Sequence, residues 1–373
     1  MQNHLNKSQT INLGSFYTPD YIVEIVYKML LNYLVKNKLN LNDFVLLDSS
    51  CGYGNFLHNS KKHNNLDFKK KIGVDIDKKA LKIAKENFIN YKNPPLFLHK
   101  NSLINVIRKN FKIYNSDKLI IIGNPPYNDK TSIVQNHIKN KNYEVDLNLK
   151  CRDLGMSFLL SFNELKADYI CILHPLSYLI KNANFKILKK FFSNYKLIDS
   201  VIISSQIFCP YSLGFFPIII ALYEKNKKGI NYDFIKNYNF KTIDDKIFCL
   251  NDFDFISKYI DKYPNKNRVS DKVAMFYTMR DINALRRSKT FIKKDCANAV
   301  YVPKSKYSLY CYVDVFKQNI KTVPYYFGNC DIMIDYNKFK ILEKEFIKAS
   351  KSKILNSKIL NYFENLLGEH YAN

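Results

Sequence analysis

Long hydrophobic runs and paired cysteines are both missing from this 373-residue chain. No uninterrupted apolar segment approaches the roughly 18 residues of a membrane-spanning helix, and residues 1–14 lack the apolar core of a signal peptide. The eight cysteines form no CxxC pair, which argues against a zinc site and a secreted disulfide framework. The seven histidines show no ligand-like spacing. We therefore expect a cytoplasmic protein, monomeric, with no metal and no membrane partner.

Acidic residues are scarce beside basic ones: 33 Asp and Glu face 58 Lys and Arg, for a formal net charge of +25. Such a surplus favours a polyanionic partner, and nucleic acid is the first candidate. A composition rich in Lys and Asn is also typical of proteins from AT-rich genomes, so part of the surplus need not be functional. Because both halves of the chain are about equally basic, charge alone does not locate a binding surface.

Short apolar segments alternate with amphipathic ones over the first 224 residues. Strands that alternate with helices imply right-handed crossovers and a parallel, doubly wound sheet. We therefore predict an α/β fold with a Rossmann-like, seven-stranded, mostly parallel sheet. Thr18 is expected to cap the first helix, and residues 128–150 to form a loop. The predicted strands are 44–47, 71–75, 96–99, 119–122, 169–173, 197–203 and 217–223, and the predicted helices are 20–36, 77–90, 154–165 and 184–193.

A charged break at residues 224–229 marks the expected domain boundary. Beyond it the alternation of strands and helices ends, and Tyr, Phe, Lys and Asn become frequent. The sequence thus predicts a first domain over 1–225 and a smaller mixed domain over 226–373, which ends in one long helix over 338–367.

The most informative segment is LIIIGNPPY at residues 119–127. An apolar strand stops there and presents an amide, two prolines and an aromatic ring. Because proline has a fixed φ and no backbone N–H, this tip is rigid and leaves carbonyl oxygens free to accept. The Asn124 side-chain oxygen and the Pro125 carbonyl, held beside the Tyr127 ring, suit a planar substrate with an –NH2 group, such as adenine.

A glycine-containing turn follows the first predicted strand, in DSSCGYGNF at residues 48–56. Ligands of α/β sheets bind at the carboxyl ends of strands, where Gly52 and Gly54 permit close approach. Asp75 ends the next strand, where a carboxylate can accept hydrogen bonds from both ribose hydroxyls. This order predicts an adenosine-type cofactor. The full GxGxxG pattern is absent because position 57 is Leu, which counts against a dinucleotide.

With these motifs the chain resembles the adenine-N6 DNA methyltransferases whose cofactor motifs precede the catalytic motif and whose target-recognition domain is C-terminal. The segments that carry the resemblance are FYTP at 16–19, DSSCGYGNF at 48–56, VDID at 74–77, NSL at 101–103 and NPPY at 124–127. They cover about residues 14–224. Ser49 and Asn101 depart from the usual Pro and Asp, and the second change would alter the hold on the cofactor's adenine.

The resemblance implies a class I methyltransferase fold with S-adenosylmethionine as cofactor. The residues it implies for cofactor binding are Thr18, Asp48, Cys51, Gly52, Gly54, Asp75, Ile76, Asn101 and Asn124. Those it implies for catalysis are Asn124, Pro125 and Tyr127. Phe208 would cover the second face of the substrate base, with Phe215 and Phe216 as rivals.

The expected chemistry is methyl transfer to the exocyclic N6 of an adenine flipped out of the duplex, which costs a few kcal/mol. Two acceptors, from Asn124 and Pro125, would localise the N6 lone pair and stabilise the positive charge that grows on it. Tyr127 would stack on the base, a contact worth roughly 1–3 kcal/mol.

The densest basic stretch lies in the second domain, and such groups neutralise phosphates. We expect it to bind double-stranded DNA in a sequence-specific enzyme, the modification half of a restriction–modification system whose second partner is a cognate endonuclease. Two alternatives remain: methylation of RNA adenine or of a protein glutamine amide, and a non-catalytic DNA-binding subunit. The residues expected to contact DNA are Arg280, Arg286, Arg287 and Lys289.

Overall fold

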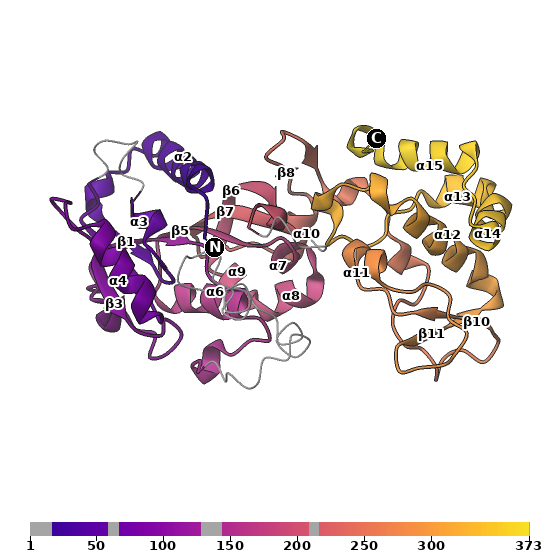
Figure 1. Cartoon of the computed structure of the whole chain (residues 1–373), viewed down its shortest axis with the longest axis horizontal. Helices are drawn as coiled ribbons and strands as arrows, with labels where there is room; N and C mark the ends of the chain where they lie inside the picture. Colours follow the sequence, from indigo (N-terminus) through magenta and orange to yellow (C-terminus); the bar gives the residue numbers. More distant parts are fainter. Residues whose placement is uncertain (1–16, 59–66, 128–143, 209–215, 373) are drawn as a thin grey trace. The chain divides into compact units, whose positions relative to one another are not determined.

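A computed structural model of the chain describes residues 17–58, 67–127, 144–208 and 216–372 (Figure 1). The chain divides into two compact units. The first contains residues 1–202 and 218–234, and the second contains residues 203–217 and 235–373. The expected arm over 1–15 and most of the expected loop, residues 128–143, lie outside the described residues, as does Phe215.

The centre of the first unit is a seven-stranded sheet in the order β3-β2-β1-β4-β5-β7-β6. Strands β1 to β5 pair in parallel, and β7 runs antiparallel to β5. The prediction of an α/β fold with a Rossmann-like, mostly parallel sheet is confirmed, and each predicted strand is present with ends that differ by a few residues. The strands are β1 (Phe44–Asp48), β2 (Lys70–Asp75), β3 (Leu96–His99), β4 (Lys118–Gly123), β5 (Tyr169–Pro175), β6 (Tyr195–Ser204) and β7 (Pro217–Lys225).

Helices flank these strands (Figure 1), because each helix carries one apolar stripe that must be buried. Helix α2 (Asp20–Lys36) buries Ile22, Val26 and Leu30 and has the bounds that the sequence predicts. Its cap differs from the prediction: Pro19 occupies the N-cap position without a side-chain hydrogen bond, so Thr18 does not cap the helix. The other helices are α3 (Asn55–His58), α4 (Lys78–Asn87), α6 (Leu154–Glu164), α7 (Ser177–Ile180), α8 (Asn182–Ile187) and α9 (Lys189–Phe192).

The helix predicted over 184–193 is wrong in its continuity. The chain leaves helical geometry at Leu188, whose ψ is 12°, so α8 and α9 are separate. The break lets Phe191 and Phe192 turn into the core, where both are buried. Phe192 stacks on Phe185 and Phe191 on Tyr195, with ring centroids 4.4 and 4.6 Å apart. Aromatic packing of this kind overrides the weak helical preference of the segment.

The second unit is built from short strands, several helices and many aromatic side chains. The single helix predicted over 338–367 is wrong: three helices occupy it, because the chain breaks at Leu342 and again at Lys353, which has a φ of 61°. Tyr312 lies among Phe346, Tyr362 and Phe363 in the core. Its elements, including α10 at the change of unit, are α10 (Tyr232–Lys236), β8 (Phe240–Lys241), β9 (Ile247–Phe248), β10 (Lys272–Tyr277), α11 (Ile282–Arg287), β11 (Ala299–Pro303), α12 (Tyr307–Gln318), α13 (Tyr336–Ile341), α14 (Glu343–Ser352) and α15 (Ser357–Leu367).

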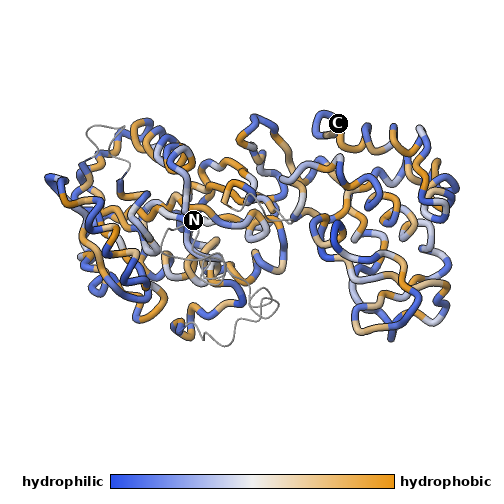
Figure 2. Tube along the Cα trace, viewed as in Figure 1, coloured by the Kyte–Doolittle hydropathy of each residue, from blue (hydrophilic) through white to orange (hydrophobic). Residues whose placement is uncertain are grey.

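Hydropathy follows this architecture, because hydrophobic residues gather on the strands and alternate with hydrophilic ones along the helices (Figure 2). Within the described part of the chain, none of the helices combines the length and the apolar character needed to cross a bilayer.

Candidate active site

The carboxyl ends of β1 and β4 lie side by side at the point where the strand order reverses. The chain continues from β1 to β2 on one side and from β4 to β5 on the other, and Asp48 pairs in register with Ile122. Ligands of open α/β sheets bind in the crevice outside such a switch point. The two segments that the sequence singles out, 48–56 and 124–127, both begin here.

Asp48 lies over the last residue of β4. Gly123 has a φ of 140°, and a Cβ atom there would come within 2.8 Å of Asp48 Oδ1, so only glycine fits. Oδ1 accepts a hydrogen bond from Ser50 N (3.1 Å). Oδ2 is buried and has no partner among the described residues, and the same holds for Ser50 Oγ. Burial raises the pKa of Asp48 to about 8, opposed by the Ser50 N–H and aided by nearby Asp75.

The glycine turn is tied to the end of β2. Cys51 N donates to Val74 O (2.9 Å), and Gly52 N donates to Asp75 Oδ2 (2.8 Å). Gly52 and Gly54 have φ values of 50° and 84°, which favour glycine. Burial raises the pKa of Asp75, although backbone donors oppose the shift. Burial also raises the pKa of the Cys51 thiol, so Cys51 packs as a neutral side chain.

Asn124 follows the last residue of β4, and its side-chain amide is hydrogen-bonded through the nitrogen. Its Nδ2 donates to Thr18 Oγ1 (3.2 Å). Its Oδ1 is buried and has no hydrogen-bond partner among the described residues. Pro125 is buried, and Tyr127 is half-buried. A rigid acceptor without a partner, at the end of the central strand, is the feature expected of a site that binds an amino group.

Tyr127 packs against the first turn of α6. A Cβ atom on Gly155 would lie 2.9 Å from Tyr127 Cβ and 2.5 Å from the Tyr178 hydroxyl, so the helix approaches only because residue 155 is glycine. Tyr178 donates to Asp153, the N-cap of α6. Behind it, His174 stacks on Tyr178, with ring centroids 5.4 Å apart.

His174 supports Tyr178 by packing and does not titrate near neutral pH. Its ring nitrogens contact Pro175 O (3.0 Å) and the Tyr223 hydroxyl (2.7 Å). Burial lowers the pKa of His174 to about 4. Sequence reasoning missed this support of Tyr127, because the partners are distant along the chain and no motif marks them.

Two predicted cofactor residues lie on the β2–β3 side. Ile76, just after β2, is 60% exposed, which is unusual for isoleucine at the end of a buried strand. The Asn101 side chain is used in the fold: Oδ1 accepts from Leu103 N (2.9 Å) and Nδ2 donates to Glu144 O (2.8 Å). Its contact with a cofactor adenine stays a prediction.

The remaining predicted residues belong to the second unit. Phe208 is half-buried and follows the short turn Ser205–Ile207. Arg280, Arg287 and Lys289 are exposed. Arg286 is half-buried and donates to the backbone oxygens of Ile320 (3.3 Å) and Val323 (3.5 Å), so part of its guanidinium serves the fold.

The carboxyl edge fits a cationic nucleoside such as S-adenosylmethionine. A buried acceptor without a partner in the described ranges, Asp48 Oδ2, would meet its charged part. The turn at Gly52 leaves room for close approach, and exposed Ile76 offers an apolar surface for a purine ring. Among the residues that the structure describes, no three His, Cys, Asp or Glu side chains gather closely enough to hold a metal ion.

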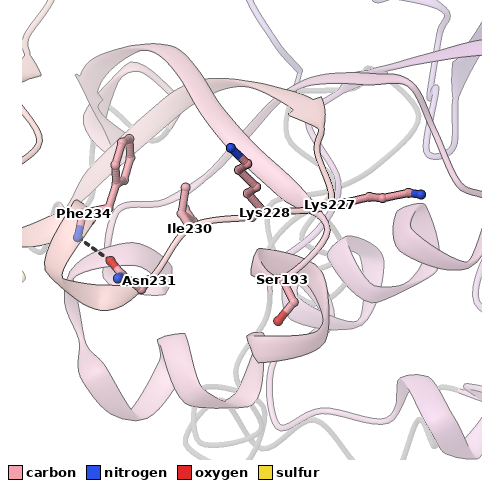
Figure 3. A pocket seen from close by; sticks show the side chains of 7 residues that line it. Ser193, Lys227, Lys228, Ile230, Asn231 and Phe234 are labelled. Carbon is pink, nitrogen blue, oxygen red and sulfur yellow. Dashed lines mark hydrogen bonds between the residues drawn. The ribbon is translucent and has the colours of Figure 1, made fainter.

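A separate cavity of about 430 Å³ lies at the opposite edge of the sheet, next to the chain that leaves β7. The end of β7 marks this edge, because Lys225 N donates to Asp168 O just before β5 begins. Lys227 and Lys228 extend from its rim in different directions (Figure 3). Gly229 closes the turn, with a φ of 55° and no room for a Cβ atom beside Phe192 O. This cavity is no part of the candidate active site.

The N-6 DNA Methylase family model matches residues 1–292. The Type II methyltransferase M.BanIII of Aneurinibacillus aneurinilyticus is 31% identical over 126 residues, which cover 31% of this chain and 22% of that protein. The chain thus matches about a fifth of that relative's length.

Two solved structures are similar in fold. The type I restriction-modification system methyltransferase subunit of Streptococcus thermophilus is 15% identical and covers 96% of this chain and 59% of its own, with a TM-score of 0.42. Magnesium protoporphyrin IX methyltransferase of Synechocystis PCC 6803, with bound SAM, is 16% identical. The match covers 60% of this chain and 85% of that protein, with a TM-score of 0.32. The family assignment rests on the model match, which spans most of the chain. This protein therefore belongs to the N-6 DNA methylase family of S-adenosylmethionine-dependent methyltransferases.

Proposed function

We propose that the protein transfers a methyl group to N6 of adenine in double-stranded DNA. The observation that carries this proposal is Asn124 Oδ1, a buried acceptor at the end of the central strand with no partner among the described residues. An unmade hydrogen bond in a buried place costs about 1–3 kcal/mol. A fold that keeps such a group beside two prolines and an aromatic ring does so to bind a donor.

The exocyclic nitrogen of adenine is a poor nucleophile, because its lone pair is delocalised into the ring. Asn124 Oδ1 and the Pro125 carbonyl each accept one N6–H and hold the nitrogen with its lone pair localised. Bound S-adenosylmethionine supplies the methyl group. The N6 lone pair forms the new N–C bond, the S–C electrons stay on sulfur, and the charged nitrogen then loses one proton to solvent. Acceptors fixed beforehand stabilise the growing positive charge.

Cofactor binding involves the glycine turn and its acidic neighbours. Asp48 would accept from the ammonium group of the methionine part, and Asp75 from the ribose hydroxyls while it holds Gly52 N. Ile76 and Asn101 would line the adenine ring, and Cys51 and Gly54 would shape the turn. Thr18 would close the methionine end through its backbone segment.

The base has to leave the duplex to reach Asn124, at a cost of a few kcal/mol. Tyr127 stacks on one face of it, a contact worth roughly 1–3 kcal/mol. Gly155 and Tyr178 support this ring from behind. Phe208 stays our candidate for the aromatic side chain that covers the other face.

The second unit binds the duplex through exposed basic side chains, with Arg280, Arg287 and Lys289 on phosphates or guanine edges. Arg286 contributes charge while its guanidinium remains hydrogen-bonded to the fold. In this role the protein is the modification enzyme of a restriction–modification system, and a cognate endonuclease is its partner in the cell.

The test is to incubate the protein with tritiated S-adenosylmethionine and, in parallel, duplex DNA, total RNA or a protein extract. The labelled product is digested and identified. We expect label as N6-methyladenine in DNA. Label confined to RNA, or to protein glutamine, would replace DNA as the substrate, and no label in any reaction would leave a non-catalytic DNA-binding subunit. The Asn124→Ala variant, which we expect to be inactive, is the negative control for this assay.

A further inference from the structure

Thr18 joins the segment before α2 to the end of β4, 106 positions away. Its Oγ1 lies 3.2 Å from Asn124 Nδ2, and the residue is only 5% exposed. The sequence predicts that Thr18 caps α2, and the family resemblance implies that it binds the cofactor. The structure excludes the cap and shows this contact in its place.

The position of Thr18 is fixed by the fold. Its carbonyl oxygen accepts from Asn55 Nδ2 (2.8 Å), at the start of α3. The next residue, Pro19, is the N-cap of α2, and its carbonyl oxygen accepts from Ile22 N (3.0 Å). Helix α2 is held in turn by the Tyr27 hydroxyl, which donates to Phe56 O (2.6 Å). Thr18 Oγ1 is thus a stationary partner for the amide.

A carboxamide needs such a partner because its two ends have the same shape and opposite hydrogen-bonding character. A half-turn of the amide exchanges the acceptor Oδ1 for the donor Nδ2. The substrate amino group is itself a donor, so only one of the two orientations can hold it. The Thr18 hydroxyl can also donate to Oδ1, but that orientation would turn Nδ2 towards the substrate donor. Only with Nδ2 donating to Thr18, as in the structure, does Oδ1 remain for the substrate.

We propose that Thr18 is a positioning residue that sets the orientation of the Asn124 amide for catalysis. This rests on the proposed role of Asn124 as the acceptor of the substrate amino group. Without the hydroxyl, the productive orientation loses the acceptor of Nδ2, and the reversed orientation places a donor against the substrate donor. Leaving a buried donor unmatched lowers the rate by about tenfold to about a hundredfold.

The first test compares Thr18→Val, which keeps the shape and removes the hydroxyl, with Thr18→Ser, which keeps the hydroxyl. We expect Thr18→Val to lower kcat by about tenfold or more with an unchanged Kd for S-adenosylmethionine, and Thr18→Ser to stay near the wild type. A higher Kd with an unchanged kcat would mean that Thr18 only contacts the cofactor, and would overturn the proposal. Thr18→Ala replaces Thr18→Val if the latter does not melt cooperatively.

The decisive test is a double-mutant cycle with Asn124→Asp. A carboxylate has two equivalent oxygens and no orientation to set. Thr18→Val should therefore lower kcat when residue 124 is Asn and have little effect in the Asn124→Asp background. Equal factors in both backgrounds would refute the orientation role and leave a packing role for Thr18.

The cycle is run with whichever substrate the tritium assay identifies, because every planar amine or amide donates in the same way. A substrate other than adenine would then defeat the proposed function without touching the proposal for Thr18. A second readout, the Asn124 side-chain amide signal in a ¹H–¹⁵N spectrum, needs no substrate. Asn124→Ala identifies the signal, and Thr18→Val should shift it and speed its hydrogen exchange. An unchanged signal would also overturn the proposal.

Discussion

The two edges of the central sheet treat buried polar groups in opposite ways. At the edge where the parallel strands end, Asp48 Oδ2 and Asn124 Oδ1 are buried and have no partner within the described residues. At the edge where they begin, Asp117 accepts from Lys69 Nζ (2.7 Å) and from Tyr114 N (2.8 Å).

The titration of the carboxyl groups reflects this difference. Burial raises the pKa of Asp48 to about 8. Burial would raise that of Asp117 as well, but Lys69 and the Tyr114 N–H hold the pKa of Asp117 below its usual value. Arg108 completes that edge by donating to Asp117 O (2.7 Å) and Leu165 O (2.8 Å).

Both edges are made by the same strands, so the contrast does not come from the sheet itself. It comes from the side chains and backbone groups that the loops at each edge contribute. The loops at the starting edge bring cations and backbone donors that satisfy the Asp117 carboxylate, which is what stability requires. The loops at the other edge leave acceptors open at a cost to stability, which is expected of a site kept ready for a ligand.

The largest effect is expected at the open acceptor. Asn124→Ala should lower kcat by at least about a hundredfold, because it removes the group that stabilises charge on the attacking nitrogen. The Kd for S-adenosylmethionine should stay close to that of the wild type in calorimetry. Near-normal turnover by the variant would remove the basis for reading this edge as catalytic.

The second effect concerns the ring beside that acceptor. Tyr127→Ala should lower kcat/KM by about fivefold to about 150-fold, since base stacking is worth roughly 1–3 kcal/mol. Tyr127→Phe keeps the ring and serves as the matched control, which should behave like the wild type in the same tritium assay. If both variants lose activity equally, the hydroxyl and not the stacking surface is what matters.

The third effect sharpens the contrast between the carboxyl groups. With a pKa of about 8, Asp48 is largely protonated at pH 6, and a cationic ligand favours its ionised form. The affinity for S-adenosylmethionine should therefore rise by up to about tenfold per pH unit between pH 6 and 8, and Asp48→Asn should lose this dependence. Subtracting the two profiles removes the titration of the ligand's own amino group.

The stability of the cofactor-free protein should fall as pH rises, in contrast to its affinity for S-adenosylmethionine. A carboxyl whose pKa is raised on folding stabilises the protein fully below its unfolded value, and this contribution is lost as pH rises through about 8. The cofactor-free Asp48→Asn variant should therefore have a higher Tm than the wild type at pH 8 and a similar Tm near pH 4. A lower Tm at pH 8 would show that Asp48 is stabilised in its ionised form without ligand.

The smallest effect on function is expected at the satisfied edge. Asp117→Asn should leave kcat and the cofactor Kd unchanged while it lowers the free energy of unfolding by about 1–3 kcal/mol at pH 7. Because the pKa of Asp117 is lowered, its contribution is present above the unfolded value and is lost as pH falls through the folded one. Denaturant melts of variant and wild type should therefore converge towards pH 3. A loss of activity without a loss of stability would contradict the contrast between the edges.

Sequence reasoning succeeds where a pattern is local. The strands are predictable because runs such as 119–122 are apolar and short, and Asp48 and Asn124 because they end such runs. It fails where distant side chains decide. The helix expected over 184–193 is broken by aromatic packing around Phe192. The helix expected over 338–367 breaks at Leu342 and at Lys353, whose side chain pairs with the distant Asp314. The expected cap at Thr18 is wrong because Pro19 occupies the N-cap position, and no local pattern points to the contact of Thr18 with Asn124.

The sequence by itself determined the fold class and the location of the rigid tip that we propose to be catalytic, because alternation of apolar segments and the fixed geometry of proline act over a few residues. Only the tertiary structure decided which end of the Asn124 amide is left for a ligand, how Tyr127 is supported and which carboxyl is left unsatisfied. These depend on contacts between residues up to 106 positions apart, and the chain makes such contacts only after the sheet has brought its strand ends together.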